Sequence, residues 1–110
     1  MCGRFSLYTD MEQMKERFDV QFVSNEEDYY PNYNIAPSQS VVAIINDGTS
    51  NRMGKLRWGL IPSWAKDEKI GYKMINARSE TVDVKPSYRN AFTQRRCIIP
   101  MNSFYEWSAN

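Results

Sequence analysis

VVAIINDGTSNRMGKLRW, residues 41–58, is the stretch of this sequence that indicates its fold most clearly. The run VVAIIN at 41–46 is short, continuous and apolar, which predicts a buried strand. Asp47-Gly48 follows directly and is a typical signal for a hairpin turn. Because a second strand is expected around residues 52–58, the centre of the sequence predicts a β-hairpin.

The residues before this hairpin predict a strand, a short helix and a loop. Residues 3–8 alternate between polar and apolar side chains, as a strand does. Thr9 and Glu12 have the spacing of a capping box, and the apolar residues that follow share one face, which predicts a helix over 10–18. The acidic segment SNEEDYYPN, residues 24–32, is interrupted by proline and predicts a loop.

The residues after the hairpin have a less regular pattern. Residues 59–72 contain proline and glycine breakers and predict irregular structure, and KMINAR at 73–78 predicts a short strand. PSYRNAF at 86–92 predicts a helix with proline in its first turn. RRCIIPM at 95–101 predicts an apolar strand, and FYEW at 104–107 is expected to continue the sheet.

Together these elements predict one α+β domain over residues 1–110, dominated by strands, with no internal repeat and no linker. The sequence stops at SAN, shortly after a strand pattern that would ordinarily have a hairpin partner. A sheet that ends there has unpaired edge groups. We therefore expect a domain truncated at its C-terminus, or one whose sheet a second polypeptide completes.

The composition favours a globular protein without a bound metal or cofactor. No apolar run has the roughly 20 residues that cross a membrane, and the start MCGRFSLYTD has no signal-peptide pattern, so we expect no membrane partner. A cytoplasmic location, with nucleoid association on DNA, follows as an expectation. Two cysteines and no histidine cannot make a zinc site, and no phosphate-binding glycine loop is present. Cys97, in the run CIIP, is expected in the core.

The charge is unevenly distributed along the chain. Residues 1–47 carry three basic and eight acidic side chains, a net charge of −5. Residues 48–110 carry eleven basic and five acidic side chains, a net charge of +6. A basic second half suits a polyanionic partner. The alternative, an ordinary solvated surface, stays open on charge alone.

Cys2 is the residue whose position points to chemistry. Removal of Met1 would place a free α-amine and a thiol on adjacent carbons. An α-amine has a pKa of about 7.7–8.0, so a useful fraction is neutral near pH 7 and can condense with an aldehyde. The thiol can then close onto the imine carbon as a thiazolidine, a ring closure that proximity favours. The alternative is a small residue of no consequence at a frayed terminus.

Five separate segments support the chemical interpretation. They are MCGRF at 1–5, YNIAPSQ at 33–39, RWGLIPSW at 57–64, INARSET at 75–81 and CIIPMNSFYEW at 97–107. In their order and spacing they resemble the SRAP family, the SOS response-associated peptidase proteins that sense abasic sites. The resemblance spans essentially the whole chain, and it implies a mixed β-sheet or barrel with short helices, of which this chain would be the N-terminal half.

The resemblance implies three catalytic residues. Cys2 would be the nucleophile that forms the thiazolidine cross-link, and Asn76 would position the reacting amine or sugar. Glu106 would be the acid/base residue that assists removal of Met1 and imine chemistry, and we expect its carboxyl to be buried among the flanking aromatic side chains. The alternatives are a solvent-facing strand position for Glu106 and a turn or cap for Asn76.

The resemblance also implies residues that contact DNA. Arg4 and Arg78 match positions that bind the DNA backbone, where the planar guanidinium can bond two phosphate oxygens. Ion pairing with Glu80 or other acids is the alternative for these arginines. Trp64 is the better candidate for stacking on unpaired bases, whereas Trp58 is a candidate that also suits the core.

Asn34 and Pro37, within YNIAP, are expected to shape the floor of the pocket around Cys2. The sequence departs from the family in one respect, because it has no histidine and the family uses a catalytic one after the YEW motif. We expect cross-linking to survive this difference, since amine, thiol and Glu106 are present. Release of the cross-link and strand scission are expected to suffer.

The resulting hypothesis is a covalent sensor and shield of abasic sites in single-stranded DNA, with cross-linking and lyase-type activity. Met1 would be removed either by the protein's own autopeptidase activity or by an aminopeptidase. Two other functions stay open. One is a cysteine peptidase acting on other proteins, although no histidine is available as its base. The other is a non-catalytic module that binds single-stranded DNA.

Overall fold

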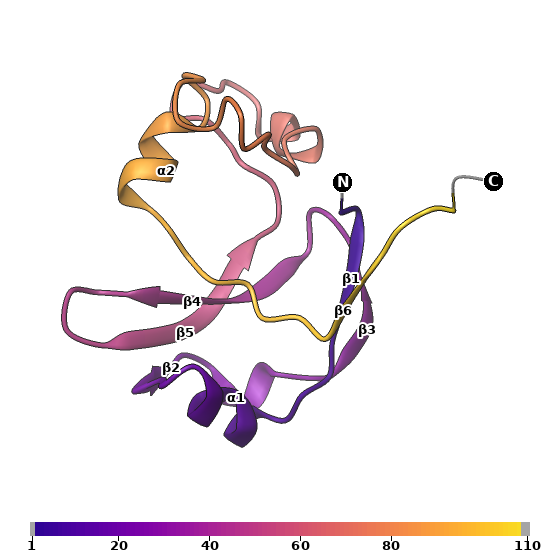
Figure 1. The fold of residues 1–110 in the computed structure, drawn as a ribbon, viewed down its shortest axis with the longest axis vertical. Helices are drawn as coiled ribbons and strands as arrows, with labels where there is room; N and C mark the ends of the chain where they lie inside the picture. Colours follow the sequence, from indigo (N-terminus) through magenta and orange to yellow (C-terminus); the bar gives the residue numbers. More distant parts are fainter. Residues whose placement is uncertain (1, 109–110) are drawn as a thin grey trace.

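The computed structural model of this protein describes residues 2–108. Within these residues the chain forms two three-stranded sheets and four short helices, in an open arrangement without a closed barrel (Figure 1). The elements are β1 (Arg4–Leu7), α1 (Met11–Arg17), β2 (Phe22–Val23), the 3₁₀-helix η1 (Glu26–Asp28), β3 (Asn32–Ile35), β4 (Ser40–Asn46), β5 (Asn51–Arg57), the 3₁₀-helix η2 (Glu68–Tyr72), α2 (Arg89–Gln94) and β6 (Ser103–Tyr105). The predicted strand-dominated α+β class is therefore confirmed.

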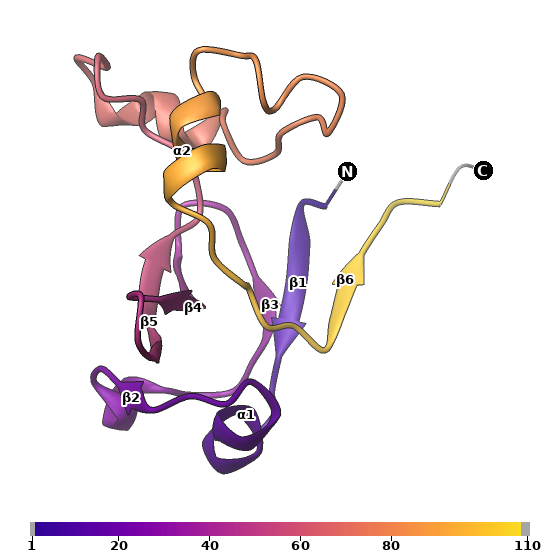
Figure 2. The ribbon, with the colours of Figure 1, turned by 60° about the vertical axis from the view of Figure 1, so that its left-hand side comes forward.

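The first sheet has β1 in the middle, between β3 and β6, and both pairings are antiparallel. Arg4 lies opposite Tyr105, and Phe5 lies opposite both Phe104 and Ile35. Figure 2 shows β1 flanked by these two strands, which are far from each other in sequence. The start of the chain is therefore the centre of a sheet, and the predicted strand at FYEW joins it from the other end of the sequence.

The second sheet contains the predicted hairpin. Strands β4 and β5 pair in one continuous antiparallel register, from Ser40 opposite Arg57 to Asn46 opposite Asn51. The two-residue strand β2 adds to β5 in parallel. Four consecutive residues of β4, from Val41 to Ile44, are buried on both faces of the strand, and Val41, Val42 and Ile44 belong to the core, as the apolar run predicts.

The core lies between the two sheets and α1. Its buried members come from β1, α1, β3, β4 and β5, namely Phe5, Leu7, Met14, Ile35, Val41, Val42, Ile44 and Met53. Met14, the one residue of α1 that is buried, anchors that helix beneath the sheets (Figure 2). At about 25 cal/mol per Å², burial of these apolar side chains is the main force that holds the sheets together.

The N-cap of helix α1 is one residue later in the sequence than predicted. The side chain of Asp10, not of Thr9, accepts a hydrogen bond from the backbone N–H of Gln13 at 2.9 Å. Thr9 is engaged elsewhere, because its hydroxyl accepts a bond from the Asn102 amide. The capping-box prediction is therefore wrong, although the predicted helix over 10–18 is present as α1.

Two predicted strands are absent from the described residues. Residues 73–78 are irregular apart from one turn residue and one bend residue. The one backbone hydrogen bond that joins them to residues 59–72 in the manner of a strand runs from the Leu60 N–H to the Met74 carbonyl. Residues 95–101 make one isolated bridge, between Ile98 and Ile44. Pro100 lacks an N–H and cannot extend that pairing.

Two other predictions need smaller corrections. The predicted loop at 24–32 contains η1 and ends where β3 begins. The predicted helix at 86–92 begins only at Arg89, because residues 81–88 form turns first. The irregular segment predicted at 59–72 is confirmed, apart from η2.

Residues 59–94 contain no strand and lie beyond the end of the sheets where β1 begins (Figure 2). Gly59 starts this segment at φ 138°, a backbone conformation that favours glycine. A Cβ at Gly59 would lie 2.3 Å from the carbonyl oxygen of Gly71, so the segment closes on itself at a point where no side chain fits. No helix among residues 2–108 is long and apolar enough to span a bilayer.

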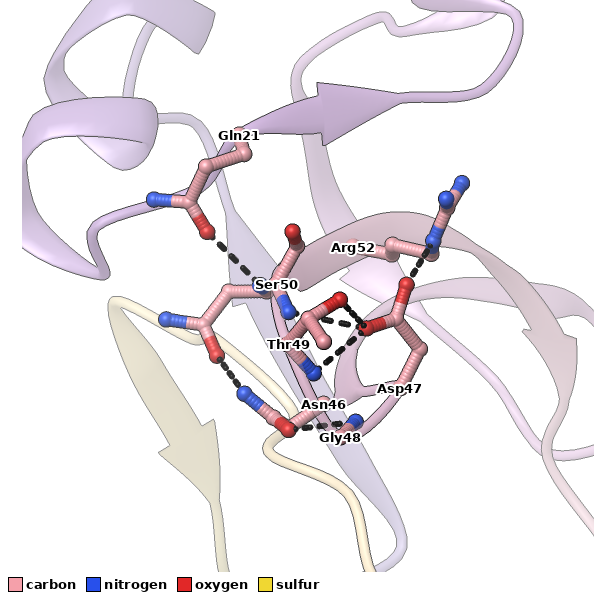
Figure 3. A network of polar contacts seen from close by, with 8 residues as sticks. Gln21, Asn46, Asp47, Gly48, Thr49, Ser50 and Arg52 are labelled. Atoms are coloured by element: carbon pink, nitrogen blue, oxygen red, sulfur yellow. Dashed lines mark hydrogen bonds and ion pairs between the residues drawn. The ribbon is translucent and has the colours of Figure 1, made fainter.

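The β4–β5 turn is organised by the carboxylate of Asp47 (Figure 3). This carboxylate accepts hydrogen bonds from the Arg52 guanidinium, from the backbone N–H groups of Thr49 and Ser50, and from the Thr49 hydroxyl. The Arg52 bond, followed by the turn's own donors, holds the pKa of Asp47 well below its usual range. The ionised carboxylate thus stabilises the turn.

We predict that Asp47→Asn lowers the urea midpoint of unfolding at pH 7, because the variant loses the charge that pairs with Arg52. A carboxyl whose pKa is lower in the folded than in the unfolded chain stabilises the folded protein fully when the pH is above the unfolded-state pKa of about 3.9. This stabilisation is lost as the pH falls through the folded-state pKa. The gap between variant and wild type should therefore shrink below about pH 4. Asp83→Asn, at an exposed position, removes the same charge and is the control. A gap that does not change with pH would contradict this account of the turn.

Candidate functional site

Cys2 lies two residues before the start of β1 and is held in a defined position. It is half-buried and packs against the hydrophobic core. Its carbonyl oxygen accepts a hydrogen bond from the Asn76 side-chain amide at 2.9 Å, and its thiol donates to the Arg4 carbonyl at 3.5 Å. The structure therefore brings together two of the three predicted catalytic residues, although 74 positions separate them in the sequence.

The segment that carries Asn76 is anchored by side chains on both sides. The indole N–H of Trp58 donates to the carbonyl of Ile75 at 3.0 Å. The hydroxyl of Tyr88 donates to the carbonyl of Asn76 at 3.1 Å. Trp58 is half-buried and its ring packs on Phe5 with centroids 5.3 Å apart, so it also belongs to the core of the site. A role for Trp58 in DNA binding stays a prediction.

An apolar cavity of about 440 Å³ opens beside Cys2. Cys2, Trp58, Asn76, Tyr88, Ala91 and Cys97 are among its lining residues. Cys97 is exposed, so its predicted place in the core is wrong. The physical reason is that this segment forms no continuous strand: it pairs with β4 through the isolated bridge between Ile98 and Ile44, and Cys97 stays exposed beside that bridge.

A polar groove of about 680 Å³ begins at the next residues of the chain. Its lining residues are Gly3, Arg4, Asn34, Tyr105, Glu106 and Trp107. The Arg4 guanidinium donates to the Asn34 side-chain oxygen at 3.2 Å, which fixes this cation on the face of the sheet. The groove therefore combines the Arg4 guanidinium and the Glu106 carboxylate with aromatic rings, next to the start of β1.

Glu106 lines this groove at the end of β6, but it is not buried. Phe104, Tyr105 and Trp107 around it are 60%, 50% and 98% exposed. The predicted burial of Glu106 among aromatic side chains is therefore wrong. Strand β6 is the edge of its sheet, because no strand of residues 2–108 pairs with its outer side. The pairing of Arg4 with Tyr105 nevertheless carries Glu106 to the start of β1.

Three predicted residues line neither the apolar cavity nor the polar groove. Arg78 and Trp64 are exposed in the segment between β5 and α2, and Trp64 shows 58% of its surface. Pro37 is half-buried in the turn between β3 and β4. Within residues 2–108 neither Arg4 nor Arg78 forms an ion pair, so the alternative of pairing with Glu80 does not hold there.

Sequence reasoning missed Tyr88, which supports the site, and Asn102, which fixes the start of β6. Tyr88 lies within the predicted helix at 86–92, and its hydroxyl contact has no signal in the sequence pattern. Asn102 accepts bonds from the backbone N–H groups of Tyr8 and Thr9 and donates to the Thr9 hydroxyl, which ties β6 to the end of β1. Its place in the quoted segment CIIPMNSFYEW is the one clue that the sequence offers.

The described residues bring together no group of three or more side chains that could hold a metal ion. The functional groups available around Cys2 are a thiol, an amide, a guanidinium and a carboxylate, besides the aromatic rings. These groups suit nucleophilic and acid/base chemistry next to a polyanion. Met1, whose removal the chemistry requires, lies outside the described residues.

Relatives of known name align with nearly the whole chain. Abasic site processing protein YoqW of Bacillus subtilis is 60% identical over 107 residues, which are 97% of this chain and 48% of that protein. Abasic site processing protein HMCES of Gallus gallus is 33% identical over 91 residues, covering 72% of this chain and 27% of that protein. This chain thus spans about half the length of the bacterial relative.

A solved structure has a fold similar to that of this chain. A crystal structure of a protein from Bordetella bronchiseptica superimposes with a TM-score of 0.73 at 27% identity, covering 96% of this chain and 50% of that one. The full sequence, residues 1–110, matches the family described as SOS response associated peptidase. This match agrees with the five segments that suggested the resemblance, and the chain belongs to the SRAP family.

Proposed function

We propose that this protein recognises an abasic site in single-stranded DNA and joins the lesion covalently through Cys2. The observation that carries the proposal is the hydrogen bond from Asn76 to the Cys2 carbonyl, at the point where the apolar cavity and the polar groove meet the start of β1. Several relatives are named abasic site processing proteins, which supports the choice of substrate.

The proposed reaction has two bond-forming steps after hydrolysis of the Met1–Cys2 peptide bond. The free α-amine of Cys2 adds to the aldehyde carbon of the opened deoxyribose, and loss of one water gives an imine. The thiolate then adds to the imine carbon, and the nitrogen takes up a proton. The product is a thiazolidine whose five-membered ring forms intramolecularly, so a high effective concentration drives closure.

The surrounding residues supply the remaining functions in this proposal. Glu106, at the end of β6, accepts the proton of the amine and returns one to the sugar ring oxygen as the ring opens. Arg4, fixed by Asn34, binds a phosphate next to the lesion. In this proposal Arg78 and Trp64, which are both exposed, contact the strand farther away, through a phosphate and a base respectively.

We predict that wild-type protein forms a denaturation-resistant adduct with an abasic-site oligonucleotide without any added reductant, and that Cys2→Ala forms none. The thiol is needed because an imine alone hydrolyses, whereas the closed ring persists. Gel electrophoresis under denaturing conditions measures the adduct. No adduct with wild-type protein would overturn the proposal.

Two controls separate the proposal from its rivals. Cys97→Ala removes the other thiol and should leave the adduct unchanged. With borohydride present, Cys2→Ala should regain an adduct, because its own free α-amine still forms an imine that reduction traps. Cleavage of added peptides would favour a peptidase, and binding that ignores the lesion would favour a non-catalytic DNA-binding module.

We predict that Arg4→Ala weakens binding of single-stranded oligonucleotides and lowers the slope of log affinity against log salt by about 1, since one phosphate contact is lost. Fluorescence anisotropy over a range of salt concentrations measures both quantities. Arg17→Ala is the matched control, because α1 lies at the opposite end of β1 (Figure 2). An unchanged salt slope in Arg4→Ala would rule out the phosphate contact.

A further inference from the structure

The segment of Ile75 and Asn76 has almost no backbone pairing of its own, yet it sits at the reacting end of the chain. It belongs to no strand or helix. Its position depends on Trp58, which holds the carbonyl of Ile75, and on Tyr88, which holds the carbonyl of Asn76. All of these contacts are partly buried, where a hydrogen bond is stronger than it is in water.

Tyr88 is connected to Cys2 through two hydrogen bonds that share Asn76. Its hydroxyl donates to the backbone carbonyl of Asn76 at 3.1 Å, and the side chain of the same Asn76 donates to the Cys2 carbonyl at 2.9 Å. Tyr88 itself is fixed because it precedes α2 and its backbone N–H donates to the carbonyl of Lys85. The phenol therefore connects a helix end to the first described residue.

We propose that Tyr88 is a positioning residue for the Cys2 reaction, an inference that rests on the proposed function. Its hydroxyl holds the Asn76 backbone at the distance from which the Asn76 amide reaches Cys2. The amide in turn fixes the Cys2 peptide plane and therefore the direction of the α-amine and thiol. A displacement of about 1 Å at a reacting group can cost up to 100-fold in rate, so such a support acts on the chemical step.

The geometry also separates this role from DNA binding. Tyr88 lines the apolar cavity and not the polar groove that contains Arg4 and Trp107. Tyr88 is half-buried, and its hydroxyl donates its hydrogen bond to the Asn76 carbonyl. Its loss should therefore slow adduct formation on bound DNA without changing the affinity for DNA.

The test is the rate of adduct formation by Tyr88→Phe, which keeps the ring and removes the hydroxyl. Single-turnover reactions over a range of protein concentrations give a saturating rate and a half-saturating concentration. We expect the saturating rate to fall about 3- to 10-fold, the range for loss of one hydrogen bond, with the half-saturating concentration unchanged. Tyr30→Phe removes a hydroxyl from an exposed tyrosine outside the site and should behave as wild type.

A double-mutant cycle with Asn76→Ala distinguishes positioning from general destabilisation. If Tyr88 acts through Asn76, Tyr88→Phe should slow the wild type but add no further slowing to Asn76→Ala. Trp58→Phe removes the other side-chain donor to this segment and should show the same non-additivity with Asn76→Ala. It replaces Tyr88→Phe in the cycle if circular dichroism shows that Tyr88→Phe is unfolded.

The outcomes separate the two proposals. Effects that multiply in the cycle, or a Tyr88→Phe rate equal to that of wild type, overturn the positioning role while leaving the proposed function intact. Failure of wild type and Tyr30→Phe alike to form any adduct overturns the proposed function instead.

Discussion

Strand β1 is paired on both of its edges, and the rest of the structure depends on this constraint. Its partners, β3 and β6, lie far apart in the sequence, and its buried side chains Phe5 and Leu7 belong to the core. An N-terminus is commonly frayed because few contacts hold it. Here the residues just before β1 are attached to a strand that is hydrogen-bonded on both sides, so Cys2 has a defined position from which to react.

A second constraint links this strand to the irregular segment beyond the sheets. The Asn76 amide is the direct contact between residues 59–94 and Cys2, and it is supported by Trp58 from the end of β5 and Tyr88 before α2. The site is thus built from side-chain hydrogen bonds to backbone carbonyls. Because each bond fixes the next, we expect the chemical competence of Cys2 to depend on residues that never touch the DNA.

The sequence pattern predicted those strands and helices that are long enough for the spacing of their apolar residues to be recognised. The β4–β5 hairpin follows from VVAIIN and Asp47-Gly48, and β1 follows from its alternation and α1 from its apolar face. Strand β2 has two residues and carries no such period. Residues 73–78 have a strand-like composition, but side chains of Trp58 and Tyr88 bind their carbonyls and no neighbouring strand does.

The site could be predicted in its residue types but not in its environment. The matching motifs indicated Cys2 and Asn76, and the structure places them in contact. The aromatic neighbours of Glu106 suggested burial, yet they are exposed because β6 has a partner on one side only within the described residues. Exposure of an edge strand depends on what lies beside it in space, which a sequence pattern does not contain.

The most direct measurement of the central claim is tandem mass spectrometry of the N-terminal tryptic peptide after incubation with abasic-site DNA and nuclease digestion. The account predicts a peptide that begins at Cys2, lacks Met1 and carries the sugar remnant with loss of one water, with both the α-amine and the thiol blocked. A remnant attached to a lysine, or an adduct on a chain that retains Met1, would contradict it.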